Sequence, residues 1–365
     1  MRPHTDSSAS VVPPPAPAIS GWRVRTAQIL WAAAGLFLFI LAIRTLTRGA
    51  AGLAVIMRSL SVEGFSGFLG FGWLMAYVSL SGSPVAAVSL TLLGGDTVAP
   101  LEAFAMINGS RLGASFIVLV TGFVFYLRGW RGRGVVSMGI LAMLTTATTY
   151  LPAMAVGSAA LQRGWLDRVR FDIPVRLSSI TEVAFDPIVR GLTGRLPALA
   201  VFAVGFAVLL LAFRFLDRTL PRVETRELEG RWARWLASPT MMFALGMLVT
   251  TLTMSVSVSL SILVPLAARG MVRRQPVIPY IMGANITTFI DTLVASLLVP
   301  NPAAFTVVLT EMLSVALVSV VVLFMFYDPY RRLLLWLNKT IAGSRPRFAV
   351  FVVLLAVVPL YLLLR

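Results

Sequence analysis

The chain has 365 residues, of which 58% are hydrophobic and 13% charged, whereas a soluble domain carries about 25% charged residues. This composition excludes an ordinary water-soluble domain and favours an integral membrane protein. The net charge of +16 does not indicate nucleic-acid binding, because the arginines lie in short loops and helix ends instead of on one basic face. The absence of cysteine from the sequence excludes disulfides and thiolate metal sites.

The N-terminal part of the chain is predicted to be a tail followed by a first membrane span. Residues 1–21 contain the run Pro13-Pro14-Pro15 and no hydrophobic periodicity, so we expect a disordered tail. The apolar run from Ala27 to Ile43 is close to the about 20 residues that cross a bilayer core. No small-residue cleavage pattern follows it, and we assign residues 22–48 to a retained transmembrane helix and its link.

Two longer apolar stretches are interrupted near the middle by serine-rich sequence. They run from Gly64 to Gly94 and from Met241 to Ala268. At about 1.5 Å per residue, half of such a stretch reaches only about 20 Å, which is less than a bilayer core of about 30 Å. Both are therefore predicted to be re-entrant helical hairpins. Non-helical backbone at membrane depth is tolerated only against protein or a wet cavity, so their turns are expected to face a site.

The two halves of the chain align with each other at an offset of 174 residues, without a gap. The matches include Gly72 with Gly246, Ser81 and Ser83 with Ser255 and Ser257, and Gly109 with Gly283. Three apolar crossings separate the two serine pairs, and an odd number turns the second half upside down. The predicted fold is an all-α polytopic membrane protein with two inverted repeats, about seven spans and two re-entrant hairpins.

The predicted organisation follows from these repeats. Repeat 1, a hairpin plus a span, covers residues 49–134, and connecting spans and loops cover residues 135–234. Repeat 2 covers residues 235–327, and a cytoplasmic link with a C-terminal helix covers residues 328–365. The loop with Arg128, Arg131 and Arg133 contains no acidic residue, so the positive-inside rule places it in the cytoplasm. This predicts a cytoplasmic N-terminus and, as location, the plasma (inner) membrane.

Four motifs carry a resemblance to a known family. The second half contains MSVSVS at Met254–Ser259 and GANITTF at Gly283–Phe289, and the first contains LSGSPV at Leu80–Val85 and GSRLGAS at Gly109–Ser115. They resemble the sodium-phosphate cotransporter (Na/Pi symporter) family, in which each half has a Gln-Ser-Ser-Ser hairpin and then a Gly-Ala-Asn-Ile-Gly-Thr-Thr segment. The chain looks like a divergent member, because Leu80 and Met254 replace the family's Gln and Arg111 replaces the Asn of the first half.

The polar residues of these motifs are the candidate site. Hydroxyls and carbonyls at a helix break replace the water shell of a sodium ion, and helix N-termini attract anions. The predicted substrate- and ion-binding residues are Ser81, Ser83, Arg111, Ser255, Ser257, Ser259, Asn285, Thr287, Thr288 and Asp291. Within this set, sodium is expected at Ser255, Ser257, Asn285 and Thr288. The alternative is that such small polar residues only hold membrane helices together.

Three ionisable residues lie inside apolar spans, where charges are costly and usually functional. The guanidinium of Arg111 suits the oxygens of phosphate or a carboxylate. An internal salt bridge with Asp291 explains the same two residues without a ligand, and both interpretations stay open. Glu311 carries a proton or completes an ion site in one interpretation, and only packs against a neighbouring helix in the other.

The sequence thus predicts a secondary active transporter rather than an enzyme, since it contains no paired-carboxylate, His-rich, nucleophile-elbow or phosphate-loop signature. The resemblance implies sodium-coupled symport of inorganic phosphate or a related anion, with sodium as coupling ion and no other cofactor. The expected partners are the lipid bilayer and the small anion, with no nucleic acid. The alternatives are another small anion coupled to protons or sodium, and a non-transporting membrane scaffold with the same fold.

Overall fold

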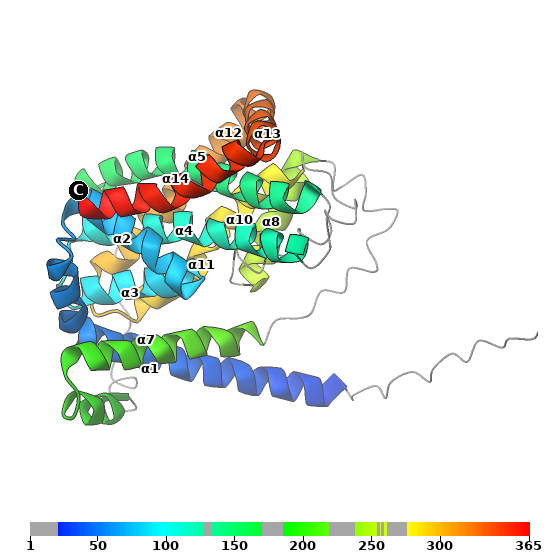
Figure 1. Cartoon of the computed structure of the whole chain (residues 1–365). Coiled ribbons are helices and arrows are strands. Elements are labelled where there is room, and N and C mark those ends of the chain that lie inside the picture. Colours follow the sequence, from blue (N-terminus) through cyan, green and yellow to red (C-terminus); the bar gives the residue numbers. More distant parts are fainter. Residues whose placement is uncertain are drawn as a thin grey trace, which may run out of the picture.

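A computed structural model describes residues 21–127, 133–169, 185–218, 238–253, 256, 259–260 and 276–365 (Figure 1). Within these ranges all regular secondary structure is helical. The helices are α1 (Gly21–Ser59), α2 (Gly64–Ser79), α3 (Gly82–Gly94), α4 (Pro100–Leu127), α5 (Arg133–Gln162), α7 (Ala198–Asp217), α8 (Pro239–Thr253), α10 (Val277–Thr287), α11 (Phe289–Leu297), α12 (Ala303–Met325), α13 (Tyr327–Ala342) and α14 (Arg345–Leu364). A short helix also covers residues 185–193.

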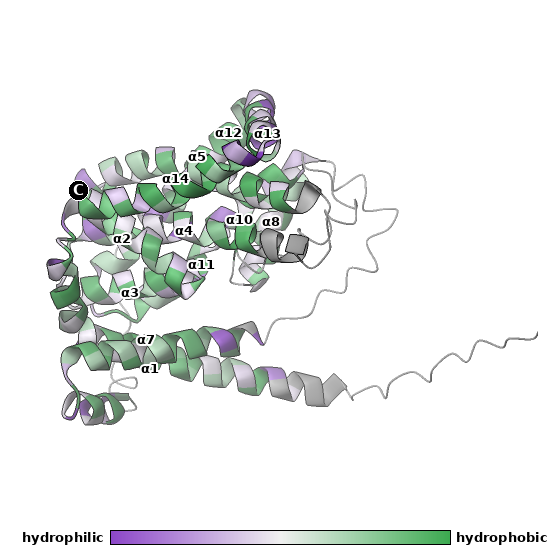
Figure 2. Ribbon diagram, in the orientation of Figure 1, coloured by the Kyte–Doolittle hydropathy of each residue, from purple (hydrophilic) through white to green (hydrophobic). Residues whose placement is uncertain are grey.

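Seven segments of the described chain are long and apolar enough to cross a membrane, which confirms the predicted number of spans. They are Gln28–Ser59, Pro100–Val120, Val136–Gln162, Ala198–Leu216, Val277–Leu297, Ala303–Met325 and Arg345–Leu364. Many large hydrophobic side chains on them are exposed, such as Phe324 and Leu364 at 69% and 70%. Such surfaces belong in lipid. Figure 2 shows the same hydrophobic character along the long helices, and more hydrophilic residues on α13. The chain is an integral membrane protein.

The first helix is longer than the sequence suggests. α1 continues past residue 48 to Ser59, so the predicted boundary between the first helix and repeat 1 falls inside one continuous helix. Residues 1–20 of the predicted disordered tail lie outside the described residues. α1 packs along α7, and the two lie side by side at one edge of the bundle (Figure 1). A Cβ atom at Gly49 would lie 2.5 Å from the backbone nitrogen of Phe202, so the two backbones are in direct contact there.

Two helix crossings are built in the same way, one between α2 and α4 and the other between α8 and α10. A side chain at Gly72 would clash with the carbonyl of Met106, and one at Gly109 with the carbonyl of Leu69. The second crossing has the same two contacts, 174 residues later: Gly246 against the carbonyl of Tyr280, and Gly283 against that of Phe243. The register of both crossings therefore follows the offset seen in the sequence. The inverted orientation of the halves stays a prediction.

The serine-rich interruption of the first half is a break between two helices. α2 ends at Ser79, Leu80 has a left-handed backbone with φ 50° and ψ 29°, and α3 begins after Ser81. A bulky residue pays for this conformation with strain. The re-entrant placement of the α2–α3 pair stays a prediction. In the second half, α8 ends at Thr253, and of the rest of the predicted hairpin only Val256, Ser259 and Leu260 belong to the described residues.

Candidate functional site

A small buried cavity of about 10 Å³ lies between residues from both halves. It is lined by Ser81, Gly82, Ser83, Arg111, Ala114, Ser115, Thr146, Tyr150, Val256, Asn285 and Thr288. Three pairs among them are related by the offset of 174 residues: Gly82 with Val256, Arg111 with Asn285, and Ala114 with Thr288. The cavity has room for about one water molecule. It therefore lies where corresponding positions of the two halves come together.

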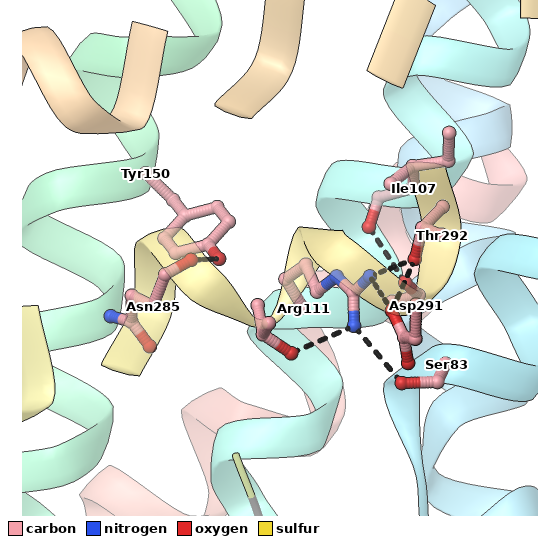
Figure 3. A network of polar contacts seen from close by, with 9 residues as sticks. Ser83, Ile107, Arg111, Tyr150, Asn285, Asp291 and Thr292 are labelled. Atoms are coloured by element: carbon pink, nitrogen blue, oxygen red, sulfur yellow. Dashed lines mark hydrogen bonds and ion pairs between the residues drawn. The ribbon is translucent and has the colours of Figure 1, made fainter. Parts of the chain in front are cut away.

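Arg111 on α4 is the centre of the polar network (Figure 3). It is 5% exposed, and among the described residues it is the only basic side chain that is buried. Its Nη1 donates to Ser83 of α3 and to Thr288 of the second half, both at 3.3 Å. Its Nη2 donates to Thr292 on α11, and its guanidinium lies 4.8 Å from the ring centre of Phe289. One arginine thus joins both halves.

The counter-ion of Arg111 is Asp291 on α11. The distance from Nη2 to Oδ1 is 3.6 Å, and Thr292 bridges the pair by donating to Oδ1 at 2.8 Å. The internal salt bridge considered from the sequence is therefore present in this conformation. It does not use all of the hydrogen-bonding groups, since Nε of Arg111 and Oδ2 of Asp291 are buried without a partner. A buried charge without its partner is costly, so each residue holds the other in place.

The second half contributes Asn285, at the position that corresponds to Arg111. Its Nδ2 donates to the hydroxyl of Thr146 on α5 at 3.2 Å. Its backbone carbonyl accepts a hydrogen bond from the hydroxyl of Tyr150, also on α5, at 2.9 Å (Figure 3). α10 ends two residues later at Thr287. Asn285 and Thr288 therefore lie near the junction of α10 and α11, beside the cavity.

The structure brings most of the predicted site residues together and separates two of them. Ser81, Ser83, Arg111, Asn285 and Thr288 line the cavity, and Asp291 pairs with Arg111. Thr287 instead donates to the carbonyl of Met247 on α8 at 3.0 Å. Ser259 accepts from Thr250 and shares a hydrogen bond with Tyr280, both at 2.8 Å. These two residues connect helices and are not in the cavity lining. Ser255 and Ser257 lie outside the described residues.

Several residues of the network were not predicted from the sequence. Thr292 follows Asp291 directly and lies one helical turn after Thr288, so its position on the same face was a usable signal. Thr146 and Tyr150 are likewise one turn apart, but on α5, which belongs to neither repeat. Their place beside the cavity depends on tertiary packing, and the repeat pattern contains no signal for it.

The fold and the cavity define an integral membrane protein with a buried, charged polar site between its helices. Residues 208–338 match the family model described as Na+/Pi-cotransporter, so this part of the chain is similar to that family. No curated protein and no solved structure matches the chain. The matched range includes Asn285, Thr288 and Asp291, whereas Ser83 and Arg111 lie before it. The match supports a transporter role, and the buried cation Arg111 lies outside the matched part.

Proposed function

We propose that the chain is a secondary active transporter that couples the movement of sodium to that of inorganic phosphate or a related small anion. The observation that carries this proposal is Arg111, a buried guanidinium at a cavity that both halves line. A buried cation surrounded by hydroxyl and amide groups suits the oxygens of an anion. The match of residues 208–338 to the Na+/Pi-cotransporter family supports phosphate as that anion and sodium as the coupling ion.

Anion binding would use donors that the present contacts leave free or weakly engaged. Nε of Arg111 has no partner, and its bonds to Ser83 and Thr288 are long at 3.3 Å. An entering anion would replace these contacts and weaken the 3.6 Å pair with Asp291. A cavity of about 10 Å³ does not hold phosphate. The halves therefore have to move apart for loading, as alternating access between two repeats requires.

The oxygen atoms beside the cavity fit a sodium ion. Ser81, Asn285 and Thr288 offer hydroxyl or amide oxygens near helix ends, where backbone carbonyls are also available. Ser255 and Ser257 complete the proposed set from the second serine motif. In this proposal the sodium charge offsets that of the anion, which explains why the two are carried together. We place the protein in the plasma (inner) membrane with a cytoplasmic N-terminus, as the acid-free arginine loop favours.

Uptake of radiolabelled phosphate into proteoliposomes tests the proposal. We expect uptake with an inward sodium gradient and none with a potassium gradient. Arg111→Gln is expected to abolish it, whereas Arg48→Gln, at an exposed arginine of α1, keeps it. Folded protein without phosphate flux under either gradient contradicts phosphate transport and favours the scaffold. Phosphate uptake that needs a proton gradient instead of sodium contradicts the proposed coupling.

A further inference from the structure

Glu311 lies in the middle of α12 and has no assigned role. Its side chain is 1% exposed, and neither carboxyl oxygen has a hydrogen-bond partner. α12 packs against α3, α4, α5 and α10, which carry cavity residues, and against α11, which carries Asp291. An ionised carboxylate that is buried without a partner typically costs several kcal/mol of stability. An uncompensated negative charge at Glu311 is therefore not compatible with this arrangement.

The charged neighbours of Glu311 do not neutralise it. Arg111 of α4 interacts electrostatically with Glu311, and Tyr150 of α5 interacts with Arg111, Glu311 and Asp291. Arg111 is already paired with Asp291 of α11. The region thus contains one guanidinium and two carboxyl groups. One proton makes this cluster neutral.

The remaining helices around α12 do not supply another charge. α10 has one titratable side chain, Tyr280, and it is hydrogen-bonded to Ser259. α3 has none in its sequence. α13 follows the other end of α12, and its Asp328 and Arg331 pair with each other at 3.1 Å. The other two basic side chains of α13, Arg332 and Lys339, are exposed. The proton is therefore the simplest counter-charge for Glu311.

The wall of an open pocket lies about one helical turn from Glu311 along α12. This pocket of about 360 Å³ lies at the start of α12, and its lining includes Asp167, Asn301, Thr306 and Val307. Glu311 follows Val307 by four residues, or about 6 Å along the helix. Thr306 and Thr310 begin a stripe of hydroxyl side chains that continues to Ser314 on this part of α12. The pocket thus offers a short polar approach to the carboxyl group.

We propose that Glu311 is a proton-binding site that exchanges with water from this pocket and controls how strongly Arg111 attracts the transported anion. The inference about anion affinity rests on the proposed function. An ionised Glu311 competes with the anion for the charge of Arg111, and a protonated Glu311 does not. If Glu311 is ionised before the anion binds, binding is therefore coupled to uptake of one proton by Glu311. A lower pH then strengthens anion binding.

Infrared spectroscopy of the purified protein tests the proton site without any transport. We expect a carboxylic-acid C=O band in the wild type that shifts in D₂O, which shows exchange, and that is lost in Glu311→Gln. Glu63→Gln, at an exposed residue before α2, is the matched control and keeps the band. The absence of the band from the wild type, its failure to shift in D₂O, or its persistence in Glu311→Gln overturns the proposal. Where the variant does not fold, the absence of the band from the wild type still overturns the proposal.

Phosphate binding at several pH values tests the link to the anion. Because the titration of phosphate itself is common to both proteins, the ratio of their affinities isolates Glu311. We expect wild-type affinity to fall relative to that of Glu311→Gln by up to about tenfold per pH unit as Glu311 ionises, which is the slope for one proton. A constant ratio overturns the control of Arg111 by Glu311. A wild type that shows the infrared band but binds no phosphate contradicts the proposed substrate and leaves the proton site established.

Discussion

The two helix crossings share one backbone design and carry different side chains. Gly109 and Gly283 occupy the same place in their crossings, and each allows a backbone carbonyl of the neighbouring helix to approach. Two residues later the first half has Arg111 and the second has Asn285, and both line the cavity. Arg111 finds its counter-ion Asp291 in the other half. Glycine therefore fixes the position of the helices, whereas the charges of the Arg111–Asp291 pair are divided between the halves.

A second difference lies one helical turn after the shared glycines Gly109 and Gly283. A Cβ atom at Gly113 would lie 2.5 Å from the carbonyl of Trp73. The corresponding residue of the second half is Thr287, whose hydroxyl donates to the carbonyl of Met247, the residue that corresponds to Trp73. At this position the two helices of the first crossing touch through their backbones, whereas those of the second are joined by a side-chain hydrogen bond.

The largest effect is expected at the shared glycines. Gly109→Val and Gly283→Val each force a side chain against the neighbouring backbone, and overpacking typically costs about 1–3 kcal/mol. Because the obstructing atoms are backbone carbonyl oxygens well within 3.0 Å of the new Cβ, we expect a loss well above this range and larger than that of the other variants below. Folded yield and melting temperature in detergent measure it. Gly191→Ala, where no atom lies within 4 Å of the new Cβ, is the control. A crossing that accepts valine in one half only contradicts the equivalence.

The ion pair between the halves is expected to have the next largest effect. Asp291→Asn leaves the guanidinium of Arg111 buried without a counter-ion, which typically costs about 3–5 kcal/mol when one partner of a buried pair is removed. The double variant Arg111→Gln/Asp291→Asn removes both charges and keeps similar shapes, so most of this loss is expected to be recovered. Thermal unfolding of the single and double variants checks it. If the double variant is destabilised as much as Asp291→Asn or more, the loss of charge compensation does not explain the effect of Asp291→Asn.

The smallest effects separate two adjacent threonines. Thr287→Val removes the hydrogen bond to Met247 and is expected to lower stability by about 1 kcal/mol, without changing phosphate affinity. Thr288→Val removes an acceptor of Arg111 at the cavity and is expected to weaken phosphate binding several-fold, with less effect on stability. Melting temperature and equilibrium binding are measured on both variants. The opposite assignment of the two effects contradicts the position of the site.

Much of the architecture could be predicted because lipid imposes a simple rule on the sequence. Seven apolar segments, the break at Leu80–Ser81 and the offset of 174 residues all correspond to features of the structure. The candidate site was harder, because neighbours such as Thr287 and Thr288 differ by about 100° around a helix. Which of them faces the cavity depends on the position of α8 and α5. The same applies to Tyr150, whose hydrogen bond to Asn285 arises only from packing between distant segments.

The central claim is that Arg111 attracts the anion at the cavity between the halves. Equilibrium binding of radiolabelled phosphate in sodium buffer tests it directly, with wild type and the charge-free double variant Arg111→Gln/Asp291→Asn. Since hydrogen bonds to charged groups contribute about 1.5–3 kcal/mol each, we expect saturable binding by the wild type and at least a tenfold loss in the folded double variant. Wild-type affinity in the double variant contradicts the claim and leaves Arg111 with a purely structural role.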